Sequence, residues 1–224
     1  MELTDTEIED IDRRARLAGS ANCWTGTSGA IAADARRLVR HVRATARPRK
    51  IIGLTGPAGA GKDLVASMIP GAHRIAFADP LYQGLAAMLG IPEGVLRDRS
   101  SKELPLADVG VSPRQLLQSL GTEWGRKMVC PDVWLRVAFW RWEQATAAGH
   151  RIIVVPDVRF SNEARQIHDE GGEVWLVHRP GVVPVAAHAS ESGLPLKSID
   201  RLVSNAGTVD QLRERVAATW AKVE

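Results

Sequence analysis

The chain has 224 residues, of which 45% are hydrophobic and 25% are charged. A chain of this length is expected to form one globular core with a small appendage. Its composition excludes a disordered, collagen-like or coiled-coil protein. The two cysteines, Cys23 and Cys130, are too few for a disulfide framework or a metal site of their own.

Charge is distributed unevenly along the chain. The net charge of +3 arises in residues 1–50, which hold ten Lys/Arg and seven Asp/Glu, whereas residues 51–224 hold nineteen of each. Residues 36–50 contain seven basic residues and no acidic one. The main body is therefore electroneutral, which argues against a nucleic acid as its partner.

The N-terminal segment is expected to form two helices, over residues 5–18 and 28–46. The second helix is amphipathic, with an apolar stripe opposite a stripe of arginines. We interpret it as a solvated basic face whose apolar side docks on a core, and a phosphate-rich partner is the alternative. The acidic N-terminus lacks the basic and apolar stretches of a secretory signal, and no 18-residue apolar run is present, so we expect a cytoplasmic protein without a membrane span.

From residue 50 onward, short apolar runs alternate with helical stretches, which predicts an α/β fold with a mainly parallel five-stranded sheet and helices on both faces. We accordingly divide the chain into an N-terminal helical extension, residues 1–49, and one domain, residues 50–224. The predicted strands are residues 50–56, 72–78, 151–157, 173–179 and 201–205. The predicted helices are residues 62–69, 80–90, 112–128, 131–148, 161–171 and 208–223.

A glycine-rich loop follows the first predicted strand and opens a helix. It fits the pattern G-x-x-x-x-G-K, whose backbone N–H groups bind phosphates and whose lysine reaches the β and γ phosphates of a nucleotide. A turn without a ligand is the alternative. Asp63 stands where such loops usually have a Ser or Thr that binds Mg²⁺, and a carboxylate binds Mg²⁺ as well. The expected ATP contacts are Gly56, Pro57, Ala58, Gly59, Ala60, Gly61, Lys62, Asp63 and Leu64.

Several further motifs occur in a fixed order after this loop. They are FADPL (77–81), SPRQLLQSLGTEWGR (112–126), PDVW (131–134), PDVRFSNEA (156–164) and HASE (188–191). Together with GKD they resemble the phage-type deoxynucleoside monophosphate kinases, within the P-loop kinases, over residues 50–220. The resemblance implies ATP and Mg²⁺ as cofactors, a deoxynucleoside monophosphate as substrate and, for a phage-encoded chain, the host cytoplasm as location. Animal-type phosphomevalonate kinases are a looser resemblance.

Residues after the third predicted strand are candidates for catalysis. Asp157 ends an apolar run, where a carboxylate orients Mg²⁺, and Arg159 lies two residues further on, where it can bind a phosphate. The alternative is that Asp157, Ser161 and Asn162 cap the following helix.

The predicted helix from Ser112 carries Gln118, Thr122 and Arg126 four residues apart on one face. That face can bind a base, a sugar and a phosphate, with Arg114 one turn earlier, although a solvated face has the same pattern. With the family resemblance, substrate binding is favoured. Trp134 is interpreted as a packing residue, with the base pocket as the alternative.

Basic residues also occur on a segment that suits a cover over the phosphates, namely Arg97, Arg99 and Lys102. Asp79 follows the second predicted strand, where it either contacts the substrate or caps a helix. Arg179 and Asn205 follow the last two strands, where the nucleoside of ATP is expected. The HASE loop is placed near the donor phosphates by the resemblance alone.

Taken together, these features predict a kinase that transfers the γ-phosphoryl group of ATP to a deoxynucleoside monophosphate. Lys62, Asp157, Arg159 and Arg126 are its expected catalytic residues, and Asp63 and Asp157 its expected metal ligands. A kinase of another phosphorylated metabolite is the first alternative, and an ATP-gated binding module is the second. Homodimerisation is left open.

Overall fold

The computed structural model describes residues 50–98, 100–182 and 194–223. The two predicted N-terminal helices, Arg99 and the HASE loop lie outside these residues. Within them, no helix combines the length and the apolar character that crossing a membrane requires.

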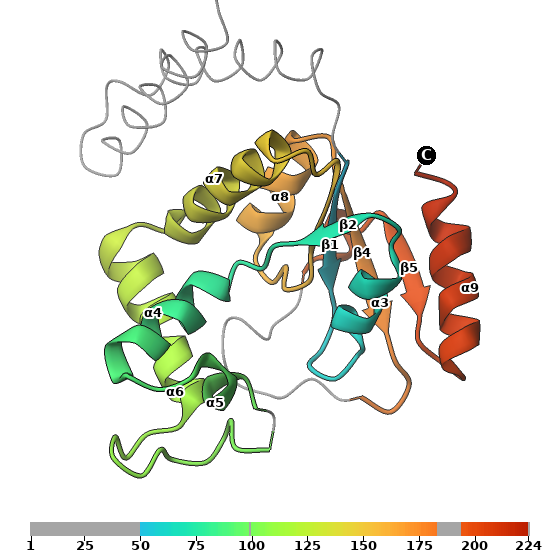
Figure 1. Ribbon diagram of the computed structural model, residues 1–224. Helices are drawn as coiled ribbons and strands as arrows, with labels where there is room; N and C mark the ends of the chain where they lie inside the picture. Colours follow the sequence, from blue (N-terminus) through green and yellow to red (C-terminus); the bar gives the residue numbers. More distant parts are fainter. Residues whose placement is uncertain (1–49, 99, 183–193, 224) are drawn as a thin grey trace, which may run out of the picture. The chain divides into compact units, whose positions relative to one another are not determined.

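The centre of the described chain is a five-stranded parallel sheet (Figure 1). Its strands follow the order β2-β3-β1-β4-β5, so the first strand of the domain lies in the middle. All four neighbouring pairs are parallel, as the alternation of strands and helices predicts. The strands are β1 (Lys50–Thr55), β2 (Ala72–Arg74), β3 (Ile152–Val155), β4 (Glu173–His178) and β5 (Arg201–Ser204).

Helices cover both faces of this sheet, which confirms the predicted α/β fold. On one face, α7 (Val133–Ala147) and α8 (Ser161–Asp169) pack on alternate strand residues such as Ile51 and Ile153, with Trp142 fully buried between them. On the other face, α3 (Lys62–Met68) and α9 (Val209–Trp220) pack on Ile52, Leu54 and Trp175. The alternation of the two faces along β1 follows from the two-residue period of a strand.

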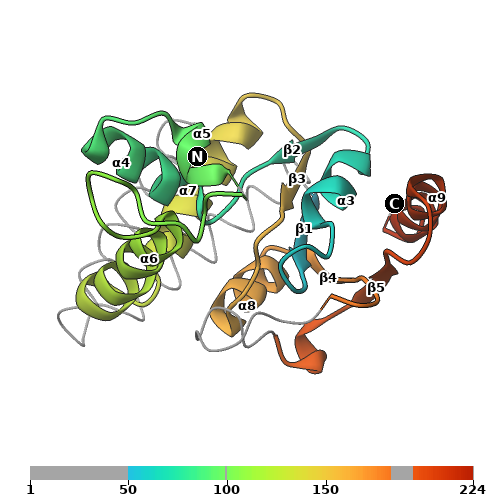
Figure 2. The ribbon, with the colours of Figure 1, turned by 90° about the horizontal axis from the view of Figure 1, so that it is seen from below.

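A smaller helical layer lies beside the carboxyl ends of the strands (Figure 2). Its own apolar cluster is centred on Tyr82, Leu85 and Leu96. This layer places a second wall opposite the glycine-rich loop. It contains α4 (Asp79–Leu89), α5 (Glu93–Arg97), α6 (Pro113–Gln118) and the π-helix η1 (Ser119–Val129).

The structure differs from the sequence prediction in four elements. The helix predicted over 112–128 is a short α-helix that continues as an 11-residue π-helix, which ends with a bond from the Cys130 N–H to the Gly125 carbonyl. The strand predicted over 72–78 ends at Arg74. Helix α5 and a short 3₁₀ turn, Leu196–Ser198, were not expected from the sequence.

Candidate functional site

The loop between β1 and α3 has a backbone that depends on glycine. Gly56, Gly59 and Gly61 have φ angles of 134°, 82° and 96°, which side chains rarely tolerate. A Cβ on Gly56 would lie 2.3 Å from the Val177 carbonyl oxygen, and one on Gly61 would lie 2.4 Å from Nδ2 of Asn205. The loop is therefore wrapped tightly against the ends of β4 and β5.

Lys62 lies across this loop. Its Nζ donates to the carbonyl oxygens of Gly56 at 2.7 Å and Pro57 at 2.9 Å. The cation is thus already held at the position where the loop curves, within reach of phosphates bound by the loop N–H groups. Glycine conformation, lysine and strand-to-helix setting together fit a nucleoside triphosphate.

Asn205 braces the loop from the end of β5. Its side-chain Nδ2 donates to the Ala60 carbonyl oxygen at 2.7 Å, and its backbone N–H donates to the His178 carbonyl oxygen at 2.7 Å. In turn, Arg215 on α9 donates to the Ser204 carbonyl oxygen at 2.9 Å. Asn205 therefore supports the phosphate loop, and its contact with the nucleoside stays a prediction. Arg179 lies exposed after β4 and remains a predicted contact.

An ion network joins the loop helix to the helical layer. Arg74 at the end of β2 lies 3.5 Å from Asp63 and 3.2 Å from Asp79, and Asp79 also accepts from Arg97 at 2.8 Å. Burial opposes ionisation of Asp79, but the Ala76 N–H at 2.9 Å and the two guanidinium groups outweigh it and lower its pKa. Asp79 thus carries a negative charge that two arginines share. Arg74 was not among the residues picked out from the sequence.

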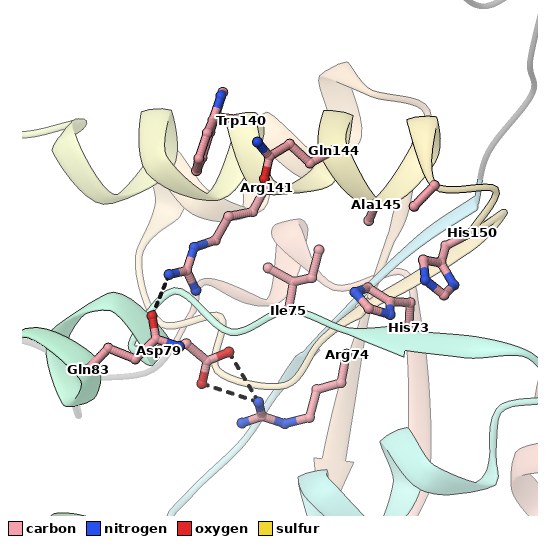
Figure 3. Close-up of a pocket in the computed structure, with 11 residues that line it drawn as sticks. His73, Arg74, Ile75, Asp79, Gln83, Trp140, Arg141, Gln144, Ala145 and His150 are labelled. Atoms are coloured by element: carbon pink, nitrogen blue, oxygen red, sulfur yellow. Dashed lines mark hydrogen bonds and ion pairs between the residues drawn. The ribbon is translucent and has the colours of Figure 1, made fainter. Parts of the chain in front are cut away.

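Beside this network lies an open cleft of about 530 Å³ between β2, α4 and α7 (Figure 3). Arg74 and Asp79 lie on its β2 and α4 side, and Arg141 from α7 donates to the Gln83 side-chain oxygen at 2.6 Å. At its far end, His73 and His150 stack with ring centroids 3.9 Å apart.

Asp157 anchors the chain after β2. Its two carboxylate oxygens accept from the backbone N–H groups of Phe77 and Ala78, each at 2.9 Å. Burial raises its pKa, and these hydrogen bonds and the charge of Arg159 oppose that rise. Its partners are therefore in the segment before α4, and not at the start of α8. Binding of Mg²⁺ by Asp157 stays a prediction.

Arg126 forms a buried ion pair that the sequence did not reveal. Its guanidinium lies 2.5 Å from Glu163 and stacks on the Phe160 ring at 4.0 Å, and the two side chains are only 13% and 2% exposed. The other oxygen of Glu163 accepts from the N–H groups of Arg159 and Phe160 at 2.7 and 3.0 Å. One carboxylate therefore connects η1 to the segment that carries Asp157 and Arg159.

Burial raises the pKa of Glu163 to about 7, against the opposing charge of Arg126. The acidic residue in the first turn of a helix was a visible signal. The sequence did not reveal that Glu163 pairs with Arg126, because 37 residues separate the two.

The remaining predicted substrate residues lie on the helical layer. Gln118 and Thr122 are partly exposed and make no side-chain hydrogen bond to any other described residue. Lys102 donates to the Tyr82 hydroxyl at 2.7 Å, and the Arg97 guanidinium lies over the ring of Tyr82 at 4.0 Å. Arg114 pairs with Glu103. These cations are therefore ordered by local partners.

Trp134 is a packing residue in this structure. It is 8% exposed, its indole N–H donates to the Gly121 carbonyl oxygen at 2.7 Å, and its ring lies where a Cβ of Gly125 would be. The described residues contain no group of three or more His, Cys, Asp or Glu side chains that is suited to a metal ion. Mg²⁺ held by Asp63 or Asp157 would therefore take its other ligands from phosphates and water, as this ion commonly does.

Comparison with known proteins identifies the family. The profile of the family described as deoxynucleotide monophosphate kinase matches residues 100–216, just over half of the chain. A candidate deoxynucleotide monophosphate kinase of Acanthamoeba polyphaga mimivirus is 29% identical, over 74% of this chain and 93% of that protein. The deoxynucleoside-5′-monophosphate kinase of Escherichia phage T5 is 26% identical, over 69% and 89% of the two chains.

A dephospho-CoA kinase of Symbiobacterium thermophilum is 28% identical, over 76% of this chain and 80% of that protein. The names of the phage and viral relatives agree with the activity that the motifs predict, and the residues matched by the family profile include α6, η1, Glu163 and Asn205. The chain belongs to the deoxynucleotide monophosphate kinase family.

Proposed function

We propose that this protein transfers the γ-phosphoryl group of ATP to the phosphate of a deoxynucleoside 5′-monophosphate, which gives a deoxynucleoside diphosphate and ADP. The observation that carries this proposal is the glycine loop with Lys62 held across it, at the carboxyl edge of a parallel sheet and opposite the helical layer. Ligands of such sheets bind at this edge.

The loop supplies the donor side of the reaction. Backbone N–H groups of residues 56–61 hold the triphosphate, and Lys62 exchanges its two carbonyl partners for phosphate oxygens. Asp63 and Asp157 are the carboxylates that we assign to Mg²⁺, which would supply neutralising charge to the triphosphate. Positioning and charge neutralisation dominate this chemistry, because phosphoryl transfer needs little covalent assistance.

The helical layer supplies the acceptor side. Gln118 and Thr122 offer polar groups that have no hydrogen-bond partner within the described chain, and they suit the base and sugar of the acceptor. Arg97, Lys102 and Arg114 provide positive charge around its phosphate. We assign Arg126 and Arg159 to the acceptor phosphate as well, since Glu163 fixes the orientation of both segments.

The test is Lys62→Ala, with Lys127→Ala as the matched control. Lys127 is an exposed lysine on η1 whose one ion-pair partner among the described residues is Glu123, four residues earlier. We expect Lys62→Ala to lower kcat at least 100-fold with an unchanged circular dichroism spectrum, and Lys127→Ala to retain full activity. Undiminished transfer by Lys62→Ala would refute the proposal.

A second acceptor class is favoured by the similarity to a dephospho-CoA kinase and by the looser resemblance to phosphomevalonate kinases. A panel of the four deoxynucleoside monophosphates, their ribonucleotide counterparts, dephospho-CoA and phosphomevalonate separates the classes. We expect ATP-dependent turnover only with nucleoside monophosphates. Turnover of either other compound at a higher kcat/KM would assign the protein to the second class.

A further inference from the structure

We infer that Arg74 is an additional catalytic residue, whose guanidinium contacts the phosphoryl group as it passes from donor to acceptor. This inference rests on the proposed function. It starts from the position of Arg74 at the carboxyl end of β2, the edge strand next to β3, where the chain turns toward the helical layer. Neither a local motif nor the glycine loop includes this residue.

Arg74 contacts the donor and the acceptor sides at once. Its Nε lies 3.5 Å from Oδ1 of Asp63, the residue after Lys62. Its Nη1 lies 3.2 Å from both carboxylate oxygens of Asp79, the first residue of α4 (Figure 3). The guanidinium is therefore located between the loop that binds the triphosphate and the layer that binds the monophosphate.

The local charge balance requires this cation. Asp63 and Asp79 bring two negative charges to a place where several phosphate oxygens must assemble. Asp79 is also held by Arg97, which pairs with Glu93 at 2.6 Å, whereas Arg74 pairs with both Asp63 and Asp79. Arg74 is the group that offsets the repulsion between the carboxylates and the incoming phosphates.

Arg74 also has donors left for a substrate. Its side chain is 42% exposed, and none of its contacts with other described residues uses Nη2. With Nε directed at Asp63 and Nη1 at Asp79, the planar guanidinium keeps the N–H groups of Nη2 to donate to phosphate oxygens. Two carboxylates fix its plane beforehand, so little reorganisation is needed during the reaction.

The test compares Arg74→Gln and Arg74→Lys with Arg141→Gln. Arg141 lines the same cleft from α7 and bonds to the neutral Gln83 side chain, so it controls for loss of one positive charge there. We expect Arg74→Gln to lower kcat about 100-fold or more, within the range known for losing one transition-state donor, and to change the Kd of ATP less than threefold. Arg74→Lys keeps the positive charge but loses the planar guanidinium, and its kcat should fall about tenfold. The kcat of Arg141→Gln should stay within twofold of the wild-type value.

Chemical rescue separates a catalytic role from a structural one. Guanidinium ion at tens of millimolar should restore kcat of Arg74→Ala at least tenfold, and should not restore Lys62→Ala. A kcat for Arg74→Gln within threefold of the wild type, an equal loss in Arg141→Gln, or an absence of rescue with an unchanged melting temperature would each overturn the inference. A wild-type chain that transfers phosphate to no nucleotide would instead refute the proposed function, and this assignment with it.

Discussion

Replacement of Glu163 by glutamine should remove a pH dependence of stability that this one carboxyl imposes. Burial raises its pKa in the folded chain from the ordinary 4.5 to about 7. Between those pH values the folded state holds a proton that the unfolded chain releases, so the free energy of unfolding falls as pH rises through this window. At about 1.4 kcal/mol per pH unit, the fall amounts to roughly 3 kcal/mol.

Urea unfolding, followed by tryptophan fluorescence, to which the buried Trp142 and Trp175 contribute, measures this effect between pH 4.5 and 8. The difference between wild type and Glu163→Gln isolates the carboxyl. This matters because the lowered pKa of His73, caused by burial and by His150, makes the wild-type stability rise with pH in part of the same window.

Glu173→Gln is the matched control. Glu173 also pairs with an arginine, at 2.7 Å from Nη2 of Arg201, but it is 26% exposed and the hydrogen bonds from Arg201 lower its pKa. The stability that the Glu173 carboxylate contributes is present above its unfolded pKa and is lost only as pH falls below that value. Glu173→Gln should therefore leave the slope of unfolding free energy against pH unchanged from pH 5 to 7. Equal slopes for the wild type and Glu163→Gln over that range would refute the reasoning.

Three further predictions concern packing and the phosphate loop. Gly125→Ala places a Cβ 2.6 Å from the buried Trp134 ring, so it should lower the free energy of unfolding by about 1–3 kcal/mol in urea titrations; unchanged stability would contradict the packing role. Trp134→Phe loses the 2.7 Å bond to the Gly121 carbonyl and should cost about 1 kcal/mol in the same assay, with no change in the KM of the nucleotide acceptor if Trp134 only packs. Asn205→Ala removes the brace on Ala60 and should weaken ATP binding about tenfold by calorimetry, while acceptor binding stays constant; equal weakening of both ligands would count against it.

The fold of the described chain was largely predictable because its signals are local. Five apolar runs separated by helical stretches are sufficient to predict a parallel sheet, and each run contains an observed strand. The second strand is shorter than predicted because Asp157, some 80 residues away, binds the N–H groups of Phe77 and Ala78 and turns the chain there. The π-helix was not predictable, since residues four apart share a face in an α-helix and remain close in the wider π turn.

The candidate site divides in the same way. The glycines within residues 56–63 allow the conformation of the loop, and its role follows from the motif formed by these eight consecutive residues. Arg74 and Glu163 act through partners on other elements; Arg74 lies outside every quoted motif, and Glu163 lies within PDVRFSNEA, a motif that does not reveal its partner. A basic residue at the end of a strand and an acidic one at a helix start are common in any α/β protein, so only the folded arrangement reveals what they join.

The brace from Asn205 has a consequence for synthesis of the protein on the ribosome. The glycine loop is translated near the start of the domain, but the amide that holds its Ala60 carbonyl arrives about 145 positions later, and Arg215 on the last helix supports that end of β5. A nascent chain that stops before β5 contains every residue of the loop but lacks the Asn205 side chain that binds the Ala60 carbonyl oxygen. Tight ATP binding should therefore emerge only after β5 and α9 have left the ribosomal exit tunnel, so ATP binding reports that these two elements have folded onto the loop.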